Sequence, residues 1–408
     1  MDKAEFYQSA REDLTGPLHG IRVLEATTAW AGPMAGCLLA DLGAEVIKIE
    51  HPNGEIARQL GPAVPGGSDL SLMNETANRN KRSLSVNMRD PEGRELVLGL
   101  AQSADVFLEN FKPGTLAGWQ LGFEHLQVVK PDIVYTSVSG FGQFGPHSQR
   151  AGYDPLVQAQ SGFMSLNGEI DGGPVKAPTF LGDDLGGLYG AFATLAALRH
   201  RDATGEGQHV DVCLLDAILG ACNMFPSLAR LGAPFERMGN QYAVTAPFNV
   251  YECGDGHVYM GMSLDSHWRK LLDVMDKTEL GDDPRFSSVQ SRLQHREEVD
   301  SLVADWCREH SQMHVLELLG EAGLPVAPVN TFEDCVADSH VDERGMLQSV
   351  VLSDGSQVPL LGPVPKFSRT PTTIRSVAPP LGQDNTALLR ELGVDEARQR
   401  ALEERGVL

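Results

Sequence analysis

The feature that most constrains this chain is a strand–helix–strand pattern near its N-terminus. The apolar run IRVLEAT (21–27) is typical of a buried parallel strand, and AEVIKIE (44–50) is typical of a second one. Between them, AGPMAGCLLADLG (31–43) predicts a helix with Pro33 in its first turn and Gly43 at its end. Two strands joined by one helix form a right-handed βαβ unit, so the pattern predicts a parallel sheet.

The same alternation continues along the first half of the chain. A helix is expected at 90–104, and strands are expected at 104–111 and 132–142. Alternating strands and helices predict a doubly wound, Rossmann-like α/β domain. The pattern changes between 225 and 330, where VYECGDGHVYMGM (250–262) predicts a hairpin that is followed by helical segments. This change predicts a second, smaller α+β domain.

The strong negative charge narrows the classes of partner. The formal net charge is -22 over 408 residues, whereas binders of nucleic acid and of anionic membranes need a basic surface. The six cysteines form no C-x-x-C pair, which argues against a metal site and is typical of reduced thiols in a cytosolic protein. The first residues, MDKAEFYQSAREDL, contain no apolar signal segment. We therefore expect a cytoplasmic protein without a nucleic-acid, membrane or metal partner.

An acid at the end of the second strand invites comparison with dinucleotide sites. In such sites an acid binds a ribose hydroxyl, and Glu50 ends AEVIKIE. The phosphate-binding pattern G-x-G-x-x-G is absent, however, and TTAWAGPMAG places the bulky Trp30 where backbone should approach a pyrophosphate. A purely structural βαβ unit is the favoured interpretation.

Two adjacent carboxylates stand before a glycine-rich, apolar helical stretch. They are Asp183 and Asp184 of LGDDLGGLYG (181–190). A capping role explains one of them, because its side chain would accept hydrogen bonds from N–H groups of the first turn. The other is left without a role. A carboxylate beside the positive end of a helix is expected to stay ionised, and an ionised carboxylate can act as a nucleophile.

Eight stretches, taken together and in order, resemble the class III CoA-transferases, the relatives of formyl-CoA transferase and of the carnitine and bile-acid CoA-transferases. They are LADLGAEVIKIEHPNGE (39–55), NRNKRSLSVNM (78–88), LENFKPG (108–114), SVSGFGQFGPHSQRAGYD (137–154), QAQSGFM (158–164), ATGEGQHVDV (203–212), ERGMLQSV (343–350) and PPLGQD (379–384). The resemblance extends from about residue 18 to the C-terminus.

The resemblance implies an architecture and a class of substrate. The large CoA-binding domain would consist of 1–224 plus 331–408, with the small α+β domain, 225–330, inserted between them. Two subunits would form an intertwined dimer, either a homodimer or a heteromer with a related subunit. The substrates would be an acyl-CoA and a free carboxylic acid, with coenzyme A entering as a thioester and no cofactor bound permanently.

The phosphates of CoA need local cations on so acidic a protein. The basic run NRNKR (78–82) supplies three, and loops at the carboxyl edge of the sheet are where ligands of α/β proteins bind. By the resemblance, the predicted CoA-binding residues are Ala29, Trp30, Arg79, Lys81, Arg82, Asn110, Phe111, Lys112 and Gly140. One departure is Gly118, where relatives commonly carry an arginine.

The family's catalytic carboxylate corresponds to Asp183. The resemblance implies that it attacks a donor thioester, forms an aspartyl anhydride and then an aspartyl-CoA thioester, and passes CoA to the acceptor acid. Backbone amides of glycines 140, 142, 186 and 187 are candidates for stabilising the oxyanions.

Two alternative functions are open. The 2-methylacyl-CoA racemases are similar over the whole fold but use a histidine in a G-H-D step, which here is Gly152-Tyr153-Asp154. Tyrosine is a poor base near neutral pH, since its reference pKa is about 10. The chain could also be a non-catalytic or co-catalytic subunit of a hetero-oligomeric CoA-transferase, although the retention of Asp183 argues against an inactive one.

The acceptor is the least defined part of the prediction. The long glycine-rich loop of the formyl-CoA type is missing from 238–256, which disfavours formate and oxalate. The favoured pair is succinyl-CoA as donor and a dicarboxylate, such as a substituted succinate, as acceptor.

Overall fold

The computed structural model describes residues 1–64, 70–234 and 236–408. The chain divides into two compact units. The large unit contains Met1–Phe163, Lys176–Gly232 and His340–Leu408, and the small unit contains Met164–Val175 and Ala233–Ser339. The segments 164–175 and 331–339, which the sequence analysis placed in the large domain, group with the small unit, whereas 225–232 groups with the large unit.

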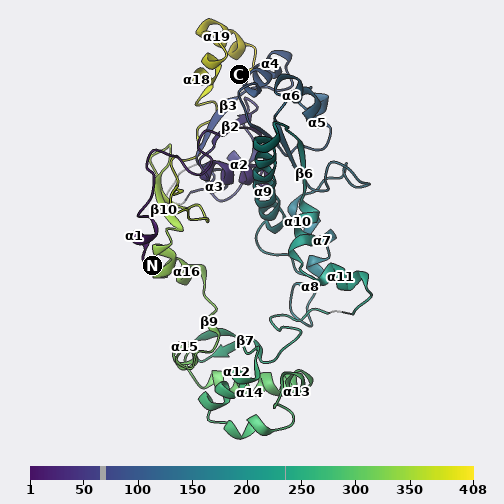
Figure 1. Ribbon diagram of the computed structural model, residues 1–408, viewed down its shortest axis with the longest axis vertical. Coiled ribbons are helices and arrows are strands. Elements are labelled where there is room, and N and C mark those ends of the chain that lie inside the picture. Colours follow the sequence, from purple (N-terminus) through teal and green to yellow (C-terminus); the bar gives the residue numbers. More distant parts are fainter. Residues whose placement is uncertain (65–69, 235) are drawn as a thin grey trace. The chain divides into compact units, whose positions relative to one another are not determined.

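A six-stranded, all-parallel sheet forms the centre of the large unit (Figure 1). Its strands lie in the order β3-β2-β1-β4-β5-β6. Their bounds are β1 Arg22–Ala26, β2 Glu45–Glu50, β3 Lys81–Ser85, β4 Val106–Glu109, β5 Val134–Ser139 and β6 His209–Cys213. The order reverses between β1 and β4, so the fold is the doubly wound α/β arrangement that the alternation predicted.

Helices and a two-stranded hairpin complete the large unit. The helices are α1 Lys3–Phe6, α2 Ala31–Asp41, η1 Ile56–Arg58, α3 Leu72–Asn78, α4 Pro91–Ala101, α5 Thr115–Gly118, α6 Phe123–Val129, α7 Asp154–Gln160, α9 Leu181–Thr204, α10 Leu214–Ala221, α11 Phe225–Arg230, α18 Asn385–Glu391 and α19 Glu396–Glu404. Two helices, α8 Phe163–Leu166 and α17 Ser339–Glu343, fall at the boundaries between the units. The hairpin is β10 Leu347–Val351 with β11 Gln357–Leu361.

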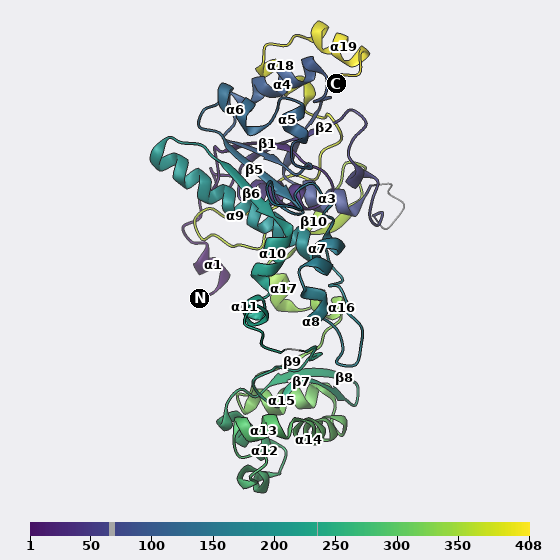
Figure 2. The same ribbon diagram turned by 90° about the vertical axis from the view of Figure 1, so that its right-hand side faces the viewer.

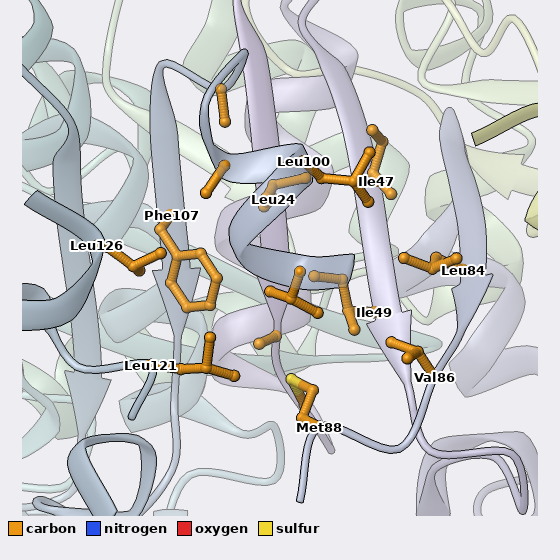
Figure 3. Packing of buried hydrophobic residues seen from close by; sticks show 14 of the residues in the cluster. Leu24, Ile47, Ile49, Leu84, Val86, Met88, Leu100, Phe107, Leu121 and Leu126 are labelled. Atoms are coloured by element: carbon orange, nitrogen blue, oxygen red, sulfur yellow. The ribbon is translucent and has the colours of Figure 1, made fainter. Parts of the chain in front are cut away.

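One face of the sheet packs against α4, α6 and the C-terminal helices. Figure 3 shows Leu24 and Ile47 of the strands beside Leu100 of α4, and Phe107 beside Leu126 of α6, all fully or almost fully buried. The same cluster includes Leu388 of α18 and Leu402 of α19, and these C-terminal helices lie beside α4 in Figure 1. Burying this apolar surface ties the two ends of the chain into one unit.

The other face of the sheet is covered by α2 and α9, which lie side by side. Glycines allow the two helices to approach closely. A Cβ atom on Gly187 would lie 3.0 Å from the carbonyl oxygen of Ala31, and one on Gly190 would lie 3.1 Å from the Cβ of Ala35. The glycine string in LGDDLGGLYG is therefore explained by helix packing.

The small unit is an α+β structure. Its antiparallel sheet has the order β7-β8-β9, and the hairpin predicted at 250–262 is confirmed by β7 and β8 (Figure 2). Its elements are β7 Phe248–Cys253, β8 Gly256–Gly261, β9 Val326–Pro328, α12 Asp265–Val274, η2 Thr278–Asp282, α13 Val289–Gln294, α14 Arg296–Arg308, α15 Gln312–Glu321 and α16 Phe332–Val336. Among the helices of the described residues, none is long and apolar enough to span a membrane.

Candidate active site

A cavity of about 520 Å³ opens at the carboxyl ends of β1, β4 and β5 in the large unit. This is the switch point of the sheet, where loops from neighbouring strands diverge and ligands of doubly wound proteins bind. The predicted site residues that line it are Ala29, Trp30, Asn110, Phe111, Lys112, Gly140 and Asp183.

The loop after β1 is held from two sides. The Asn110 side chain accepts a hydrogen bond from the Thr28 N–H at 2.8 Å and donates one to the Thr28 carbonyl oxygen at 2.8 Å. On the other side, Glu55 Oε2 accepts hydrogen bonds from the Ala29 N–H at 3.0 Å and from the Thr28 hydroxyl at 3.1 Å. Ala29 has a φ of 66°, a left-handed conformation that a non-glycine residue keeps only where its surroundings enforce it. Asn110 thus shapes this cavity wall.

A buried ion-pair network stands behind Glu55. Lys48 Nζ lies 3.4 Å from Glu55 Oε1 and 3.4 Å from Glu25 Oε1, and Lys81 Nζ lies 2.7 Å from Glu25 Oε2. Burial alone would raise the pKa of Glu55, but Lys48 and the bound N–H groups outweigh it and hold the pKa below its ordinary value. Glu55 is therefore a charged anchor for the loop.

The predicted cation run is engaged inside the protein. Lys81 is only 4% exposed, because β3 begins at this residue and its ammonium also donates to the Pro33 carbonyl oxygen at 2.8 Å. Arg79 is buried and forms an ion pair with Asp41 at 2.6 Å. Arg82 pairs with three acids, and neither Arg79, Lys81 nor Arg82 lines the Asp183 cavity. We therefore leave these three out of the proposed CoA site. Freeing Arg79 or Lys81 would leave a buried acid uncompensated, and Arg82 is held by acids of the protein itself.

The acid at the end of β2 also has an internal partner. Glu50 is 2% exposed, and Arg58 Nη2 lies 2.6 Å from its Oε1. Both oxygens of this carboxylate are already bound by Arg58, which leaves no support for the dinucleotide interpretation.

Three carboxylates meet at the start of α9, and each has a different role. Asp154 is buried, and its Oδ1 accepts the Gly182 N–H at 2.7 Å, so the cap expected from the adjacent pair is supplied by α7 instead. Asp184 accepts a hydrogen bond from Trp30 Nε1 at 2.7 Å. Asp183 lines the cavity, and within the described residues its carboxylate has no hydrogen-bond or ion-pair partner.

The protonation state of Asp183 differs from the expectation of a fully ionised group. Burial, reinforced by the charges of Asp154 and Asp184, raises the pKa of Asp183 to about 7. Desolvation and two acidic neighbours outweigh the helix terminus. A carboxyl group with this pKa is a strong functional candidate, because its ionised form is both reactive and populated near neutral pH.

The glycines divide into two groups. Gly186 and Gly187 lie inside α9, where their N–H groups donate to the preceding turn, so they are unsuited to bind an oxyanion. Gly140 lines the cavity, and a Cβ atom on it would lie 2.4 Å from the Gly152 Cα. Gly140 is thus required for two backbone segments to meet at the cavity wall.

A second cavity of about 380 Å³ adjoins the first and shares Thr28 and Phe111 with it. Arg89 and Trp119 line it, and the guanidinium lies 5.0 Å from the indole centroid. Sequence reasoning missed this pair. The sequence feature that could have indicated it is the position of the two residues. Trp119 directly follows Gly118, and Arg89 comes shortly after the end of β3, so both belong to loops at the carboxyl edge of the sheet.

A carboxylate that has no partner among the described residues faces a cavity at the switch point of a parallel sheet. This arrangement defines a doubly wound α/β protein with a candidate covalent site. Comparison with known proteins agrees with a doubly wound α/β protein and identifies its family. The chain belongs to CoA-transferase family III, whose profile matches residues 18–385. This membership confirms the predicted family and makes the protein an enzyme of the transferase class.

Similar proteins cover nearly the whole chain. The succinate–glutarate CoA-transferase of Agrobacterium fabrum is 36% identical over 384 residues, covering 92% of this chain and 96% of its own. The succinyl-CoA–L-malate CoA-transferase beta subunit of Chloroflexus aurantiacus is 35% identical, covering 93% and 94%. The crystal structure of a CAIB/BAIF family protein from Brucella suis matches with a TM-score of 0.82 at 35% identity, covering 93% and 100%.

Proposed function

We propose that this protein transfers CoA from succinyl-CoA to a second dicarboxylate, with Asp183 as the covalent carrier. The observation that carries the proposal is the contrast among the three carboxylates. Asp154 and Asp184 are occupied by hydrogen bonds, whereas Asp183 faces the cavity without a partner in the described part of the chain.

The reaction proceeds by exchange between activated acyl groups. The Asp183 carboxylate attacks the thioester carbon of succinyl-CoA and forms a mixed anhydride, and CoA leaves as thiolate. The thiolate attacks the aspartyl carbonyl carbon, which forms an aspartyl-CoA thioester and releases succinate. The acceptor carboxylate attacks that thioester and again expels CoA thiolate. The thiolate then attacks the acceptor's carbonyl carbon in the new anhydride, which regenerates Asp183. No step consumes ATP.

The dicarboxylate assignment is supported by what the relatives are named for. Besides the two already described, they include a succinyl-CoA–D-citramalate CoA-transferase of Chloroflexus aurantiacus, 35% identical, and a succinyl-CoA:mesaconate CoA-transferase of Haloarcula marismortui, also 35% identical. Every acid in these names carries two or more carboxylates, and these proteins resemble this chain over more than 90% of its length.

The two adjoining cavities suggest how CoA lies. Its thioester must reach Asp183 in the first cavity, where Lys112 supplies an exposed cation. The second cavity offers the Arg89 guanidinium, which lies over the Trp119 indole and suits a phosphate of CoA. CoA would therefore cross from one cavity to the other past Phe111, which lines both.

The assembly belongs to the proposal as well. Leu188, Tyr189 and Phe192 of α9 are 55%, 41% and 64% exposed, which is unusual for large apolar side chains on one helix. A dimer that covers these residues would remove them from water. The partner would be a second copy or a related subunit, and one relative is itself named as a beta subunit.

The racemase alternative is disfavoured by the composition of the cavity. Among the described residues that line it there is no histidine, and the position of the racemase histidine is taken by Tyr153, which is 72% exposed. A proton transfer near neutral pH would thus lack its usual base.

The experiment that tests the proposed function combines trapping with a substrate screen. Succinyl-CoA and a panel of free acids are incubated with the purified protein, and products are identified by mass spectrometry. Hydroxylamine added during turnover should convert Asp183 to a hydroxamate, because only an activated aspartyl group reacts in this way. The proposal fails if no acid receives CoA and no hydroxamate forms, or if 2-methylacyl-CoA exchanges its α-proton with deuterated water at catalytic rates.

The raised pKa of Asp183 leads to a prediction about pH. Only the ionised carboxylate attacks, so kcat/KM should be level above about pH 8 and fall about tenfold per unit well below about pH 7. Dicarboxylate substrates, with ordinary pKa values near 4 to 5, stay ionised over most of this range. A pH–rate profile with succinyl-CoA at limiting concentration tests this. A profile that stays flat down to about pH 5 would show that Asp183 is already ionised there and that its pKa has its ordinary value.

A further inference from the structure

We propose that Arg150 binds the carboxylate of the dicarboxylate acyl group that does not react, and so selects dicarboxylates over monocarboxylates. This inference rests on the proposed function and adds the residue that recognises the substrate. Arg150 lines the Asp183 cavity and is exposed. Within the described part of the chain, its guanidinium takes part in none of the hydrogen bonds or ion pairs.

The position of Arg150 is coupled to that of the nucleophile. The segment that carries it is anchored at Gly152, which meets the backbone of Gly140, and at Asp154, which accepts the Gly182 N–H at 2.7 Å. Gly182 directly precedes Asp183 in α9. Two short-range anchors therefore hold the Arg150 segment against both the end of β5 and the start of the catalytic helix.

The charges in the cavity leave Arg150 available for this role. Among the described residues, Lys112 is the other cation that lines the cavity, and it follows Phe111, which borders the proposed CoA channel. Asp183 and Asp154 line the same cavity, so a second negative charge brought in by a dicarboxylate is repelled unless a cation meets it. Arg150 supplies that cation.

The chemistry of the side chain fits the task. A guanidinium presents a planar fork of N–H donors that matches a carboxylate with two parallel hydrogen bonds. Arg79, by contrast, already uses its guanidinium to pair with Asp41. A monocarboxylate of equal length has no second carboxylate to meet Arg150, so it would gain no binding free energy from this side chain.

The test compares two acceptors of equal length, glutarate and pentanoate, with succinyl-CoA as common donor. In Arg150→Gln, the ratio of kcat/KM for glutarate to that for pentanoate should fall by about tenfold or more. Any effect on the shared donor step cancels in this ratio. Arg150→Lys should retain part of the ratio, because it keeps the charge but loses the fork. The affinity for free CoA, measured by calorimetry, should match that of the wild type.

The outcomes separate this inference from the function on which it rests. If wild-type protein transfers CoA to dicarboxylates but Arg150→Gln leaves the ratio unchanged, the role of Arg150 is refuted and the proposed function stands. If both acceptors suffer equally and CoA binds more weakly, Arg150 contacts CoA and the inference is again overturned. If the wild type transfers CoA to no dicarboxylate, the proposed function fails first.

Discussion

Replacing Asp183 by asparagine is expected to lower CoA transfer by at least ~10³-fold, since removal of a covalent nucleophile costs at least this much in comparable enzymes. An amide cannot form the anhydride from which all later steps follow. Steady-state transfer and hydroxamate trapping both measure the loss.

The loss of activity should not come from unfolding. The raised pKa of Asp183 predicts that Asp183→Asn makes the fold more stable, not less. A carboxyl group whose folded-state pKa is raised from 3.8 to about 7 binds its proton more tightly when folded, so its ionisation destabilises the fold increasingly as pH rises through this window. Asp183→Asn removes that penalty. At about pH 8 it should raise the free energy of unfolding by about 1–3 kcal/mol, and at about pH 4 the gain should vanish.

The adjacent carboxylate provides the matched control. Asp184→Asn keeps an oxygen that can accept the hydrogen bond from Trp30, so most of the activity should remain. Equal losses in Asp183→Asn and Asp184→Asn, with both proteins folded, would contradict a single nucleophile. An Asp183→Asn variant that is less stable than wild type at every pH would contradict the raised pKa.

Two lysines predicted from the sequence as CoA contacts should respond oppositely to the same substitution. Lys81→Met is expected to cost about 3 kcal/mol of unfolding free energy, because it leaves Glu25 Oε2 buried without its ion-pair partner. Lys112→Met should leave stability nearly unchanged, because Lys112 is exposed, and should weaken CoA binding by about tenfold.

Denaturant unfolding and calorimetric titration with CoA measure the two effects separately. If Lys81→Met folds poorly, Lys81→Arg is the milder substitution, because it keeps the positive charge although the larger side chain strains the site. The CoA affinity of the folded part of that sample can then be measured. A Lys81 variant that is stable but has lost CoA affinity would restore the original prediction for the basic run. Unchanged affinity in Lys112→Met would remove Lys112 from the proposed site.

The contrast between these lysines shows why residue type alone was a poor guide to the site. NRNKR was interpreted as a group of available cations, but β3 begins at Lys81 and turns the side chain toward Glu25 of β1, far away in sequence. Lys112 follows β4 in a loop at the carboxyl edge, where no acid meets it among the described residues. The same edge position explains why Asn110, Phe111 and Gly140 do line the cavity.

The sequence by itself determined the elements and their alternation, because burial of strands and helices leaves a periodic record in neighbouring residues. The resemblance to the family indicated which carboxylate to consider, because the family's catalytic carboxylate corresponds to Asp183. Only the tertiary structure decided what each charge does. Asp154 became the cap and Asp184 the partner of Trp30, whereas Arg150 lines the cavity without an acidic partner in the part of the chain that the structure describes. Whether a charged group is paired or desolvated depends on groups that the fold brings together from distant parts of the chain. The residues next to it in the sequence do not show which groups these are.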